Sequence, residues 1–127
     1  MKHTKRMTYK PKLEEIKAGR VTQTIRKGRN ISIGDTIYFI DIDLEVTVSL
    51  TIPIFCFEDF VWFGYYNTEG EFILEWWVKW TDPLIDQLAK DDGIDPPTGL
   101  ELKRVLLELY KMEAFPRDGF EMQIIVW

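Results

Sequence analysis

The sequence predicts an α+β domain in which strands outnumber helices. Three features predict it: β-branched and aromatic segments of alternating polarity, segments with helical spacing and capping residues, and an order of helix, several strands, two helices and a last strand. Such dense strands can curl into a small β-barrel of about six strands flanked by about three short helices. The 127 residues contain no repeat or linker-like composition, so we expect one domain over residues 1–127.

The composition indicates a folded protein that is neither disordered nor embedded in a membrane. Hydrophobic residues make up 46% of the chain and charged residues 29%, which excludes wholesale disorder. No apolar run approaches the roughly 18 residues that crossing a bilayer requires, and the first ten residues lack the hydrophobic core of a signal peptide. Cys56 is the only cysteine, so no intramolecular disulfide can form. We therefore expect a soluble, cytoplasmic protein without a membrane partner.

The chain should begin with a basic arm and a short helix. Residues 1–8 are expected to be flexible, and a helix is predicted from about Lys10 to Ala18. Pro11 suits a first helical turn, and Gly19 suits the position just past the helix end. The β-branched, alternating residues 21–26 that follow predict a strand.

The middle of the chain predicts three further strands. They cover residues 36–40, 44–50 and 71–80, whereas Thr51–Tyr66 is aromatic-rich and fits no single pattern. Within 71–80, alternate apolar side chains would share one core-facing side: Phe72, Leu74, Trp76, Val78 and Trp80. Core packing is therefore the expected role of Trp76 and Trp80.

Two helices and a closing strand complete the chain. Asp82 can cap a helix that has Pro83 at its first position, and Gly93 ends that helix. Thr98 and Glu101 form a capping box ahead of a second helix with apolar residues at helical spacing. Residues 120–127 form the last strand.

The charge is distributed unevenly along the chain. Residues 1–29 contain ten Lys or Arg and two acids, a net charge of +8, which leaves −13 for residues 30–127. A basic end on an acidic body favours a confined contact with a polyanion over indiscriminate coating of nucleic acid. The alternative interpretation is a solvated arm that improves solubility.

Several classes of site are excluded by counting residues. His3 is the only histidine and Cys56 the only cysteine, so a His/Cys zinc cluster cannot form. Neither common phosphate-loop motif occurs, and Asp91-Asp92-Gly93 lacks the acid spacing of a calcium loop. We therefore expect no metal and no cofactor.

The strand after Gly19 is the main candidate for a binding site. Alternation puts Thr22, Thr24 and Arg26 side by side on one face. Two hydroxyls beside a guanidinium can hold a phosphate or the edge of a base, because hydroxyls donate or accept and Arg offers a planar fork of donors. The alternative is a strand with one solvated face.

Residues 16–26, Ile-Lys-Ala-Gly-Arg-Val-Thr-Gln-Thr-Ile-Arg, and the following Ile33-Gly34-Asp35 resemble the opening of an ASCH domain, in the PUA-like superfamily. The family pattern is G-x-K-x-x-[ET]-x-R, then a hydrophobic residue with Gly-Asp before a strand. Residues 88–93, the helix after them and the last strand agree in order and spacing, so the match runs from about Tyr9 to the C-terminus. The resemblance implies a PUA-like β-barrel with a cleft beside the first motif, and RNA or modified nucleosides as ligands.

The first functional hypothesis is an RNA- or nucleotide-binding module. Five residues would line its cleft: Arg20, Thr22, Thr24, Arg26 and Asp92. Lys27 and Arg29 would extend a positive rim, and Trp77, if exposed, could stack a base.

Two other functions stay open. Some small ASCH relatives are amidohydrolases of acylated cytidine that use a Lys, a Thr and an acid. By position Thr24 matches the Thr and Asp92 the acid, but Val21 stands at the Lys position and cannot titrate. Lys17 or Lys27 would have to replace that lysine. The third hypothesis is a protein-interaction domain that acts through an aromatic patch over 62–66, the Trp62–Tyr66 region.

Overall fold

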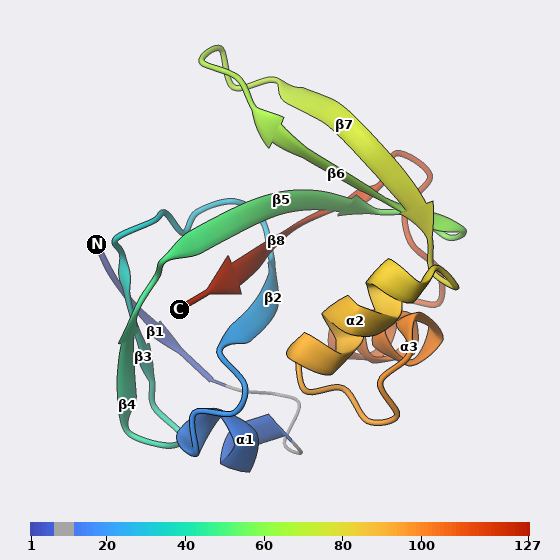
Figure 1. Cartoon of the computed structure of the whole chain (residues 1–127). Coiled ribbons are helices and arrows are strands. Elements are labelled where there is room, and N and C mark those ends of the chain that lie inside the picture. Colours follow the sequence, from blue (N-terminus) through green and yellow to red (C-terminus); the bar gives the residue numbers. More distant parts are fainter. Residues whose placement is uncertain (7–11) are drawn as a thin grey trace.

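A computed structural model describes residues 1–6 and 12–127 and confirms the α+β class (Figure 1). In this part of the chain eight strands form two sheets, with three helices beside them. The smaller sheet is ordered β1 (Lys2–Lys5), β3 (Thr36–Phe39), β4 (Leu44–Thr47). The larger sheet is ordered β2 (Gln23–Lys27), β8 (Phe120–Val126), β5 (Leu50–Cys56), β6 (Phe60–Tyr66), β7 (Phe72–Lys79). The helices are α1 (Leu13–Lys17), α2 (Pro83–Asp91) and α3 (Gly99–Leu109). Strand pairing among the described residues leaves both sheets open, so it does not form the small β-barrel of about six strands that the sequence predicted.

The last strand of the chain lies inside the larger sheet. β8 pairs antiparallel with β2 on one side and with β5 on the other, and its residues from Met122 to Ile125 are all buried. Successive side chains of a strand point to opposite faces. Ile124 therefore packs into the core beneath α2 and α3, whereas Ile125 packs into a second core beside α1. β8 joins the two cores.

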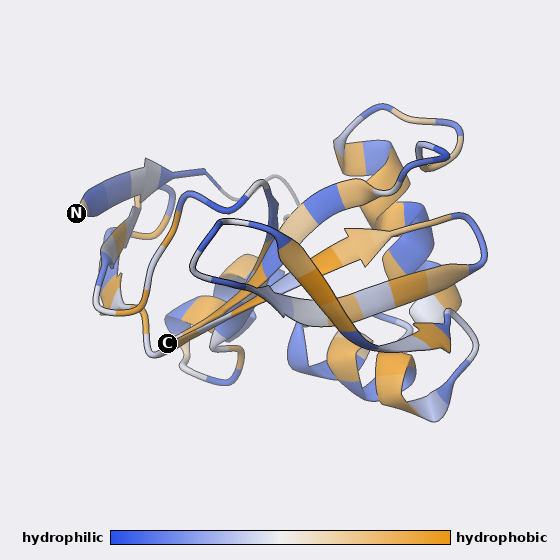
Figure 2. Cartoon of the chain, turned by 90° about the horizontal axis from the view of Figure 1, so that it is seen from above, coloured by the Kyte–Doolittle hydropathy of each residue, from blue (hydrophilic) through white to orange (hydrophobic). Residues whose placement is uncertain are grey.

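Each core has its own helices. In the larger core, Trp80, Ile85 and Leu102 are buried between the five-stranded sheet and helices α2 and α3. In the smaller core, Ile16 of α1 packs with Phe39 of the three-stranded sheet. Figure 2 shows that hydrophobic and hydrophilic residues alternate along the helices beneath the larger sheet. None of the helices in the described residues is long and apolar enough to span a membrane.

The capping residues start α2 and α3 as the sequence predicted. The Asp82 carboxylate accepts a hydrogen bond from the Leu84 N–H at 2.8 Å, and the Thr98 hydroxyl accepts one from the Glu101 N–H at 3.1 Å. In α1 the helix begins at Leu13, and residues 10–11 of the predicted helix lie outside the described residues. Gly19 adopts a left-handed φ of 76°, which fits its predicted position past the helix end.

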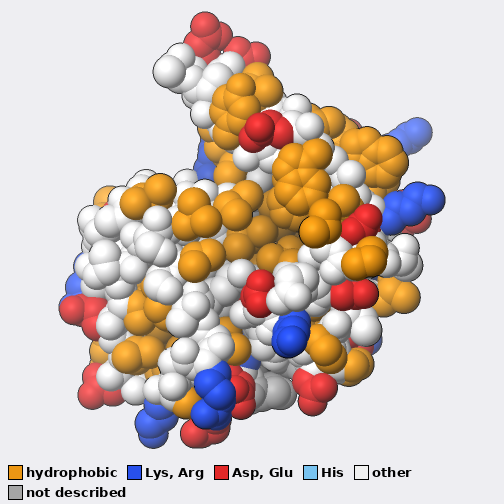
Figure 3. All heavy atoms as spheres, in the orientation of Figure 1, with side chains coloured by type: hydrophobic (Ala, Val, Ile, Leu, Met, Phe, Trp, Pro, Cys, Tyr) orange, Lys and Arg blue, Asp and Glu red, His pale blue; other side chains and the backbone are white. Residues whose placement is uncertain are grey.

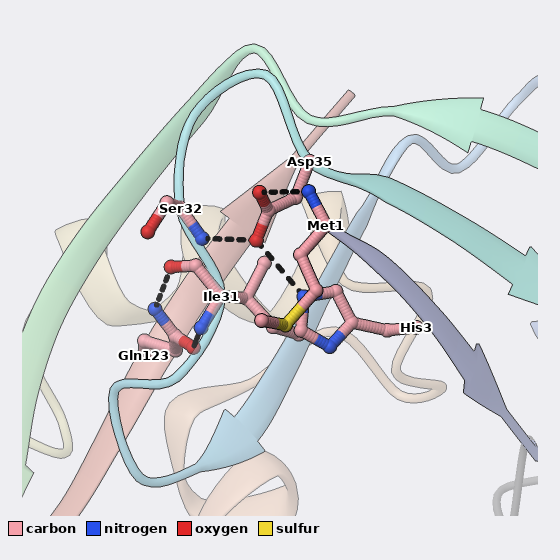
Figure 4. A network of polar contacts seen from close by, with 6 residues as sticks. All are labelled: Met1, His3, Ile31, Ser32, Asp35 and Gln123. Atoms are coloured by element: carbon pink, nitrogen blue, oxygen red, sulfur yellow. Dashed lines mark hydrogen bonds and ion pairs between the residues drawn. The ribbon is translucent and has the colours of Figure 1, made fainter.

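The N-terminal residues are paired, whereas the sequence predicted a flexible arm over 1–8. Lys2–Lys5 forms β1, which runs parallel to β3. Asp35 holds this strand: its carboxylate contacts His3 Nε2 at 2.9 Å and the Met1 amino nitrogen at 3.2 Å (Figure 4). Ser32 donates its backbone N–H to the same carboxylate at 3.0 Å. The arm prediction is therefore replaced by a strand at residues 2–5; residues 7–8 lie outside the described part.

A bulge in β7 changes which face its side chains occupy. The pairing with β6 shifts between Phe63 and Gly64, so Glu75 is an extra residue in β7. Phe72 therefore lies with Phe55 on the sheet face away from the helices, with ring centroids 4.7 Å apart. The expectation of one uninterrupted apolar face over residues 71–80 is corrected in this way.

The two tryptophans expected in the core have different environments. Trp80 is 3% exposed and donates its indole N–H to the Phe57 carbonyl at 2.8 Å, as expected of a core residue. Trp76 stacks on Phe63 with centroids 4.1 Å apart but remains 44% exposed. Its predicted role as a core residue is therefore wrong: β7 is the edge strand of the five-stranded sheet, and Trp76 lines a groove at that edge.

Asp35 makes the stability of the fold dependent on pH. The hydrogen bond from His3 and then that of the Ser32 N–H lower the pKa of Asp35 from its ordinary 3.8 to about 2. The charged carboxylate thus stabilises the fold above pH 3.8, and this contribution disappears as the pH falls through about 2. Urea unfolding should show Asp35→Asn less stable than the wild type above pH 3.8, with the difference shrinking toward pH 2.

Asp59→Asn provides the control, because it removes an exposed carboxylate that is not the one that contacts β1. A stability difference for Asp35→Asn that stays constant with pH would contradict a contribution from the charge of Asp35.

Candidate functional site

A cavity of about 140 Å³ lies where β2 faces the end of α2 and one side of α3. β2 contributes Thr24 and Arg26, and Asp92 follows α2 directly. Lys12 reaches the cavity from the residue before α1. The rest of the lining is mostly apolar: Ile25, Ile94, Val105, Leu106, Leu109 and Tyr110. The cavity therefore has a polar end and an apolar wall, as small-molecule sites commonly do.

The polar end is a buried cluster built around the Lys12 ammonium. Lys12 Nζ lies 3.3 Å from Asp92 Oδ2, and it donates to Thr24 Oγ1 and to the Gln23 carbonyl, each at 3.4 Å. Gln23 Nε2 donates in turn to Asp92 Oδ1 at 3.4 Å. All four residues are buried, with at most 8% of each exposed. The cluster satisfies buried polar groups that would otherwise be costly.

Local backbone structure brings these groups together. Asp92 ends α2, and the next residue, Gly93, has a left-handed φ of 77°. A Cβ on Gly93 would lie 3.1 Å from Lys12 Cβ and 3.1 Å from Val21 Cγ2. Lys12 and Val21 therefore pack beside the same glycine, next to Asp92. Lys12 thus extends into the cavity from beside Val21.

Burial shifts the pKa values of both partners toward their neutral forms. Desolvation lowers the pKa of Lys12 and raises the pKa of Asp92, and the attraction between the two charges opposes both shifts. Burial also lowers the pKa of Arg26. Buried ionisable groups that share a cavity in this way are typical of sites that bind or transfer protons.

The volume and charge of the cavity limit its ligand. A cavity of about 150 Å³ holds a benzene-sized ring, so this one is of a suitable size for one six-membered ring. Lys12 and Arg26 carry two positive charges against the one negative charge of Asp92. The excess positive charge favours a ring with electron-rich oxygens or an attached anion. The hydroxyl of Thr24 adds a group that donates or accepts.

Three of the predicted site residues line this one cavity: Thr24, Arg26 and Asp92. Arg20 lies elsewhere, because its guanidinium bonds the exposed Glu15 carboxylate at 2.6 Å. Thr22 is exposed, and its carbonyl accepts the Trp127 N–H at 3.0 Å at the start of β2. Arg20 and Thr22 therefore do not belong to the lining, because the strand begins only at Gln23.

The other predicted binding residues lie apart from the cavity. Lys27 Nζ lies 5.7 Å from the centroid of the Phe120 ring, and Arg29 lies over the Tyr66 ring at 4.3 Å. Trp77 is 55% exposed on β7, at the other edge of the five-stranded sheet from β2. The lysines considered as replacements at position 21, Lys17 and Lys27, are exposed and absent from the lining.

Three residues of the cavity and its buried cluster are not singled out by the sequence: Lys12, Gln23 and Tyr110. Lys12 was counted among the basic N-terminal residues. The available signal was its position one helical turn before Ile16, which puts it on the apolar side of α1. Tyr110 ends α3 and lines the cavity, and its hydroxyl accepts the Lys27 backbone N–H at 3.0 Å. No pattern in the sequence distinguished Tyr110 from a packing residue.

Residues that could ligate a metal are scattered over the described part of the chain. Within residues 1–6 and 12–127, no group of three or more His, Cys, Asp or Glu is placed to hold a metal ion. Cys56 is fully buried, which raises the pKa of its thiol and keeps it protonated.

Comparisons of the chain with protein-family models, with curated proteins and with solved structures find no match. Inference about function therefore starts from the cavity itself.

The Lys12–Asp92 pair should be necessary for stability. Lys12→Met leaves a buried carboxylate without its partner, and breaking such a pair typically costs about 3–5 kcal/mol. We expect urea unfolding to show a loss of this size, part of which is recovered when Asp92→Asn is added. Lys17→Met, on the exposed side of α1, should change stability by less than about 0.5 kcal/mol.

Equal stability of Lys12→Met and the wild type would show that the pair does not form in solution.

Proposed function

We propose that this chain binds a pyrimidine nucleotide, free or within RNA, with the base in the cavity between β2 and α3. The observation that carries the proposal is that Thr24, Arg26 and Asp92, separated by up to 68 positions, line one cavity sized for a single ring. Those residues also carry the resemblance to an ASCH domain. The proposal includes membership of that family and a cytoplasmic location.

The chemistry of a pyrimidine base matches the cavity. Its flat faces would pack on the apolar wall around Ile94 and Leu106. Its edge carries carbonyl oxygens and, in cytosine, an amino group, which would bond to the Thr24 hydroxyl, the Lys12 ammonium and the Asp92 carboxylate. A purine has two fused rings, which match a cavity of about 140 Å³ less well than one ring does. The proposal therefore includes a preference for pyrimidines.

The charge of the chain supports binding of a nucleotide rather than a neutral base. Arg26 lines the cavity and has a guanidinium of the kind that binds phosphate, although its Nη2 also donates to the Arg6 carbonyl at 3.1 Å. The N-terminal segment over residues 1–29 carries +8, whereas residues 30–127 carry −13. A nucleic acid would thus be attracted near β2 and repelled elsewhere, so the contact would be short.

Binding should depend on Arg26 and not on Arg20. Isothermal titration with cytidine 5′-monophosphate should show Arg26→Ala weaker than the wild type by about tenfold to a hundredfold, since a charge-assisted hydrogen bond is worth about 1.5–3 kcal/mol. Arg20→Ala removes an equal charge outside the cavity and should leave the affinity unchanged. Adenosine 5′-monophosphate should bind more weakly than the cytidine nucleotide.

Equal affinities for the two nucleotides, or equal losses in the two variants, would contradict binding in this cavity.

A second function, hydrolysis of an amide on a pyrimidine, is favoured by the contact of Lys12 with Thr24. The sequence argued against it because Val21 occupies the lysine position, but Lys12 supplies an amine 3.4 Å from Thr24 Oγ1. Burial lowers the pKa of Lys12, which increases the fraction of neutral amine that can act as a base. Asp92 would hold the lysine in place and stabilise its protonated form.

The reaction would proceed by acyl transfer in two steps. The Lys12 amine takes the hydroxyl proton of Thr24 as Oγ1 attacks the acyl carbon, and the proton passes to the departing exocyclic amino group of the pyrimidine as the amide bond breaks. A water molecule then attacks the ester on Thr24, which releases the carboxylic acid and restores the hydroxyl. Each step conserves the atoms and needs no redox partner.

Turnover of N4-acetylcytidine tests this second function. Released cytidine, followed by chromatography, should be abolished in Thr24→Val and retained in Thr22→Val, which changes an exposed threonine outside the cavity. The rate should rise with pH through the lowered pKa of Lys12, because only the neutral amine takes a proton.

The wild type could bind cytidine nucleotides but release no cytidine from the acylated nucleoside. This outcome would contradict hydrolysis and agree with the binding function.

A further inference from the structure

A groove of about 460 Å³ lies between β7 and α2, and it shares no lining residue with the cavity of the candidate site. Its floor is the helix-facing side of the five-stranded sheet, where Ile52, Phe63 and Ile124 line it. Figure 3 shows hydrophobic side chains gathered in this hollow and acidic side chains near its rim. Apolar pockets of this size with a few polar groups commonly bind small molecules.

One buried polar side chain opens into the groove without a partner. Gln23 is 8% exposed and lines the groove, and its Nε2 lies 3.5 Å from the Leu88 carbonyl and 3.4 Å from Asp92 Oδ1. Because a carbonyl only accepts hydrogen bonds, the amide nitrogen faces α2 and Oε1 faces away from it. Oε1 accepts no hydrogen bond from the described residues, and none of their buried side-chain polar atoms lacks a partner. Oε1 is therefore accessible, in the groove that Gln23 lines.

The other polar groups of the groove are acceptors as well. Glu75 of β7 and Asp91 of α2 place carboxylates on opposite walls, and neither forms an ion pair within the described part of the chain. Gln87 donates its Nε2 to Asp91 Oδ1 at 2.9 Å, so its amide oxygen remains as an acceptor. The described residues that line the groove include no Lys, Arg or His. The groove thus offers negative charge and hydrogen-bond acceptors, and it has no cation of its own.

Two further features favour a positively charged ligand. Asp91 belongs to the last turn of α2, where the free backbone carbonyls carry a partial negative charge. Trp76 lines the groove and remains 44% exposed, and the face of an indole ring attracts cations. Leu88, which Gln23 contacts, and Asp91 lie three residues apart on α2, so Gln23 and Asp91 meet at the same end of the groove.

We propose that the groove between β7 and α2 binds a small organic ammonium ion with a flat, apolar body. The body would pack on the hydrophobic floor beside Trp76, and the ammonium would donate to Gln23 Oε1 and to the Asp91 carboxylate. A neutral analogue loses the attraction to the carboxylates, and an anionic analogue is repelled by them. The ligand is thus opposite in charge to the nucleotide proposed for the cavity.

This site does not depend on the proposed nucleotide function. Gln23 lies between the two hollows, because it lines the groove and contacts Asp92, which lines the cavity. The two sets of lining residues are otherwise separate, so each ligand can be followed by resonances that belong to one site. Failure of one proposal would say nothing about the other.

Three indole compounds of similar shape test the charge preference. Tryptamine carries an ammonium, tryptophol a hydroxyl and indole-3-acetate a carboxylate. Isothermal titration should show tryptamine binding about tenfold more tightly than tryptophol, and indole-3-acetate binding most weakly. In nuclear magnetic resonance spectra, tryptamine should shift the methyl groups of Leu50, Ile52 and Leu84 and the side-chain amide of Gln23. The methyl groups of Val105 and Leu109, which line the cavity, should not shift.

A pair of matched variants tests the role of Asp91. Asp91→Asn should weaken tryptamine binding by about threefold to tenfold and leave tryptophol binding unchanged, because only the ammonium is attracted by the carboxylate. Asp118→Asn removes an equal charge outside the groove and should have no effect. Both positions are exposed, and a normal far-ultraviolet circular dichroism spectrum will verify folding.

The proposal is overturned if tryptamine gives no saturable shift, if its shifts lie outside the groove, if the three compounds bind equally, or if the two variants bind tryptamine alike.

Discussion

The buried ion pair between Lys12 and Asp92 is the contact on which the candidate site depends. Lys12 precedes α1, which packs in the smaller core, and Asp92 ends α2, which packs in the larger core. Their contact at 3.3 Å therefore joins two parts of the molecule that otherwise meet mainly through β8. Because charges are costly to bury without a partner, the pair fixes how the start of α1 approaches the end of α2. The cavity forms between them.

The contacts of Lys12 also explain how this residue can serve both the stability of the fold and the proposed reaction. Gln23 and Thr24 are consecutive residues of β2, and both contact the ion pair: Gln23 through Asp92 and Thr24 through Lys12. Lys12 is held in one position by three oxygen atoms, so its amine is directed at the Thr24 hydroxyl. A ligand in the cavity would meet polar groups that are already oriented, which lowers the ordering cost of binding.

The sequence predicted the features that local chemistry determines. The caps at Asp82 and Thr98 and the glycine after α1 depend on neighbouring residues, and they lie where expected. The polar strand with Thr24 and Arg26 was also found, because alternation along a strand is a local pattern.

The features that depend on distant contacts could not be predicted in the same way. Lys12 acts through Asp92, which is 80 positions away. The bulge at Glu75 moves the side chains that follow it to the opposite face of the sheet. It arises from the register between β7 and β6. β1 is a short strand of mostly polar residues that owes its place to Asp35, so its composition resembled that of a solvated arm.

The most direct test of the account is a nuclear magnetic resonance titration of methyl groups with cytidine 5′-monophosphate. Ile94, Val105, Leu106 and Leu109 line the cavity, whereas Leu50, Ile52 and Leu84 line the groove beside β7. The account predicts saturable shifts at the first set and none at the second. Shifts confined to the groove, or no saturable shift at any methyl group, would contradict it.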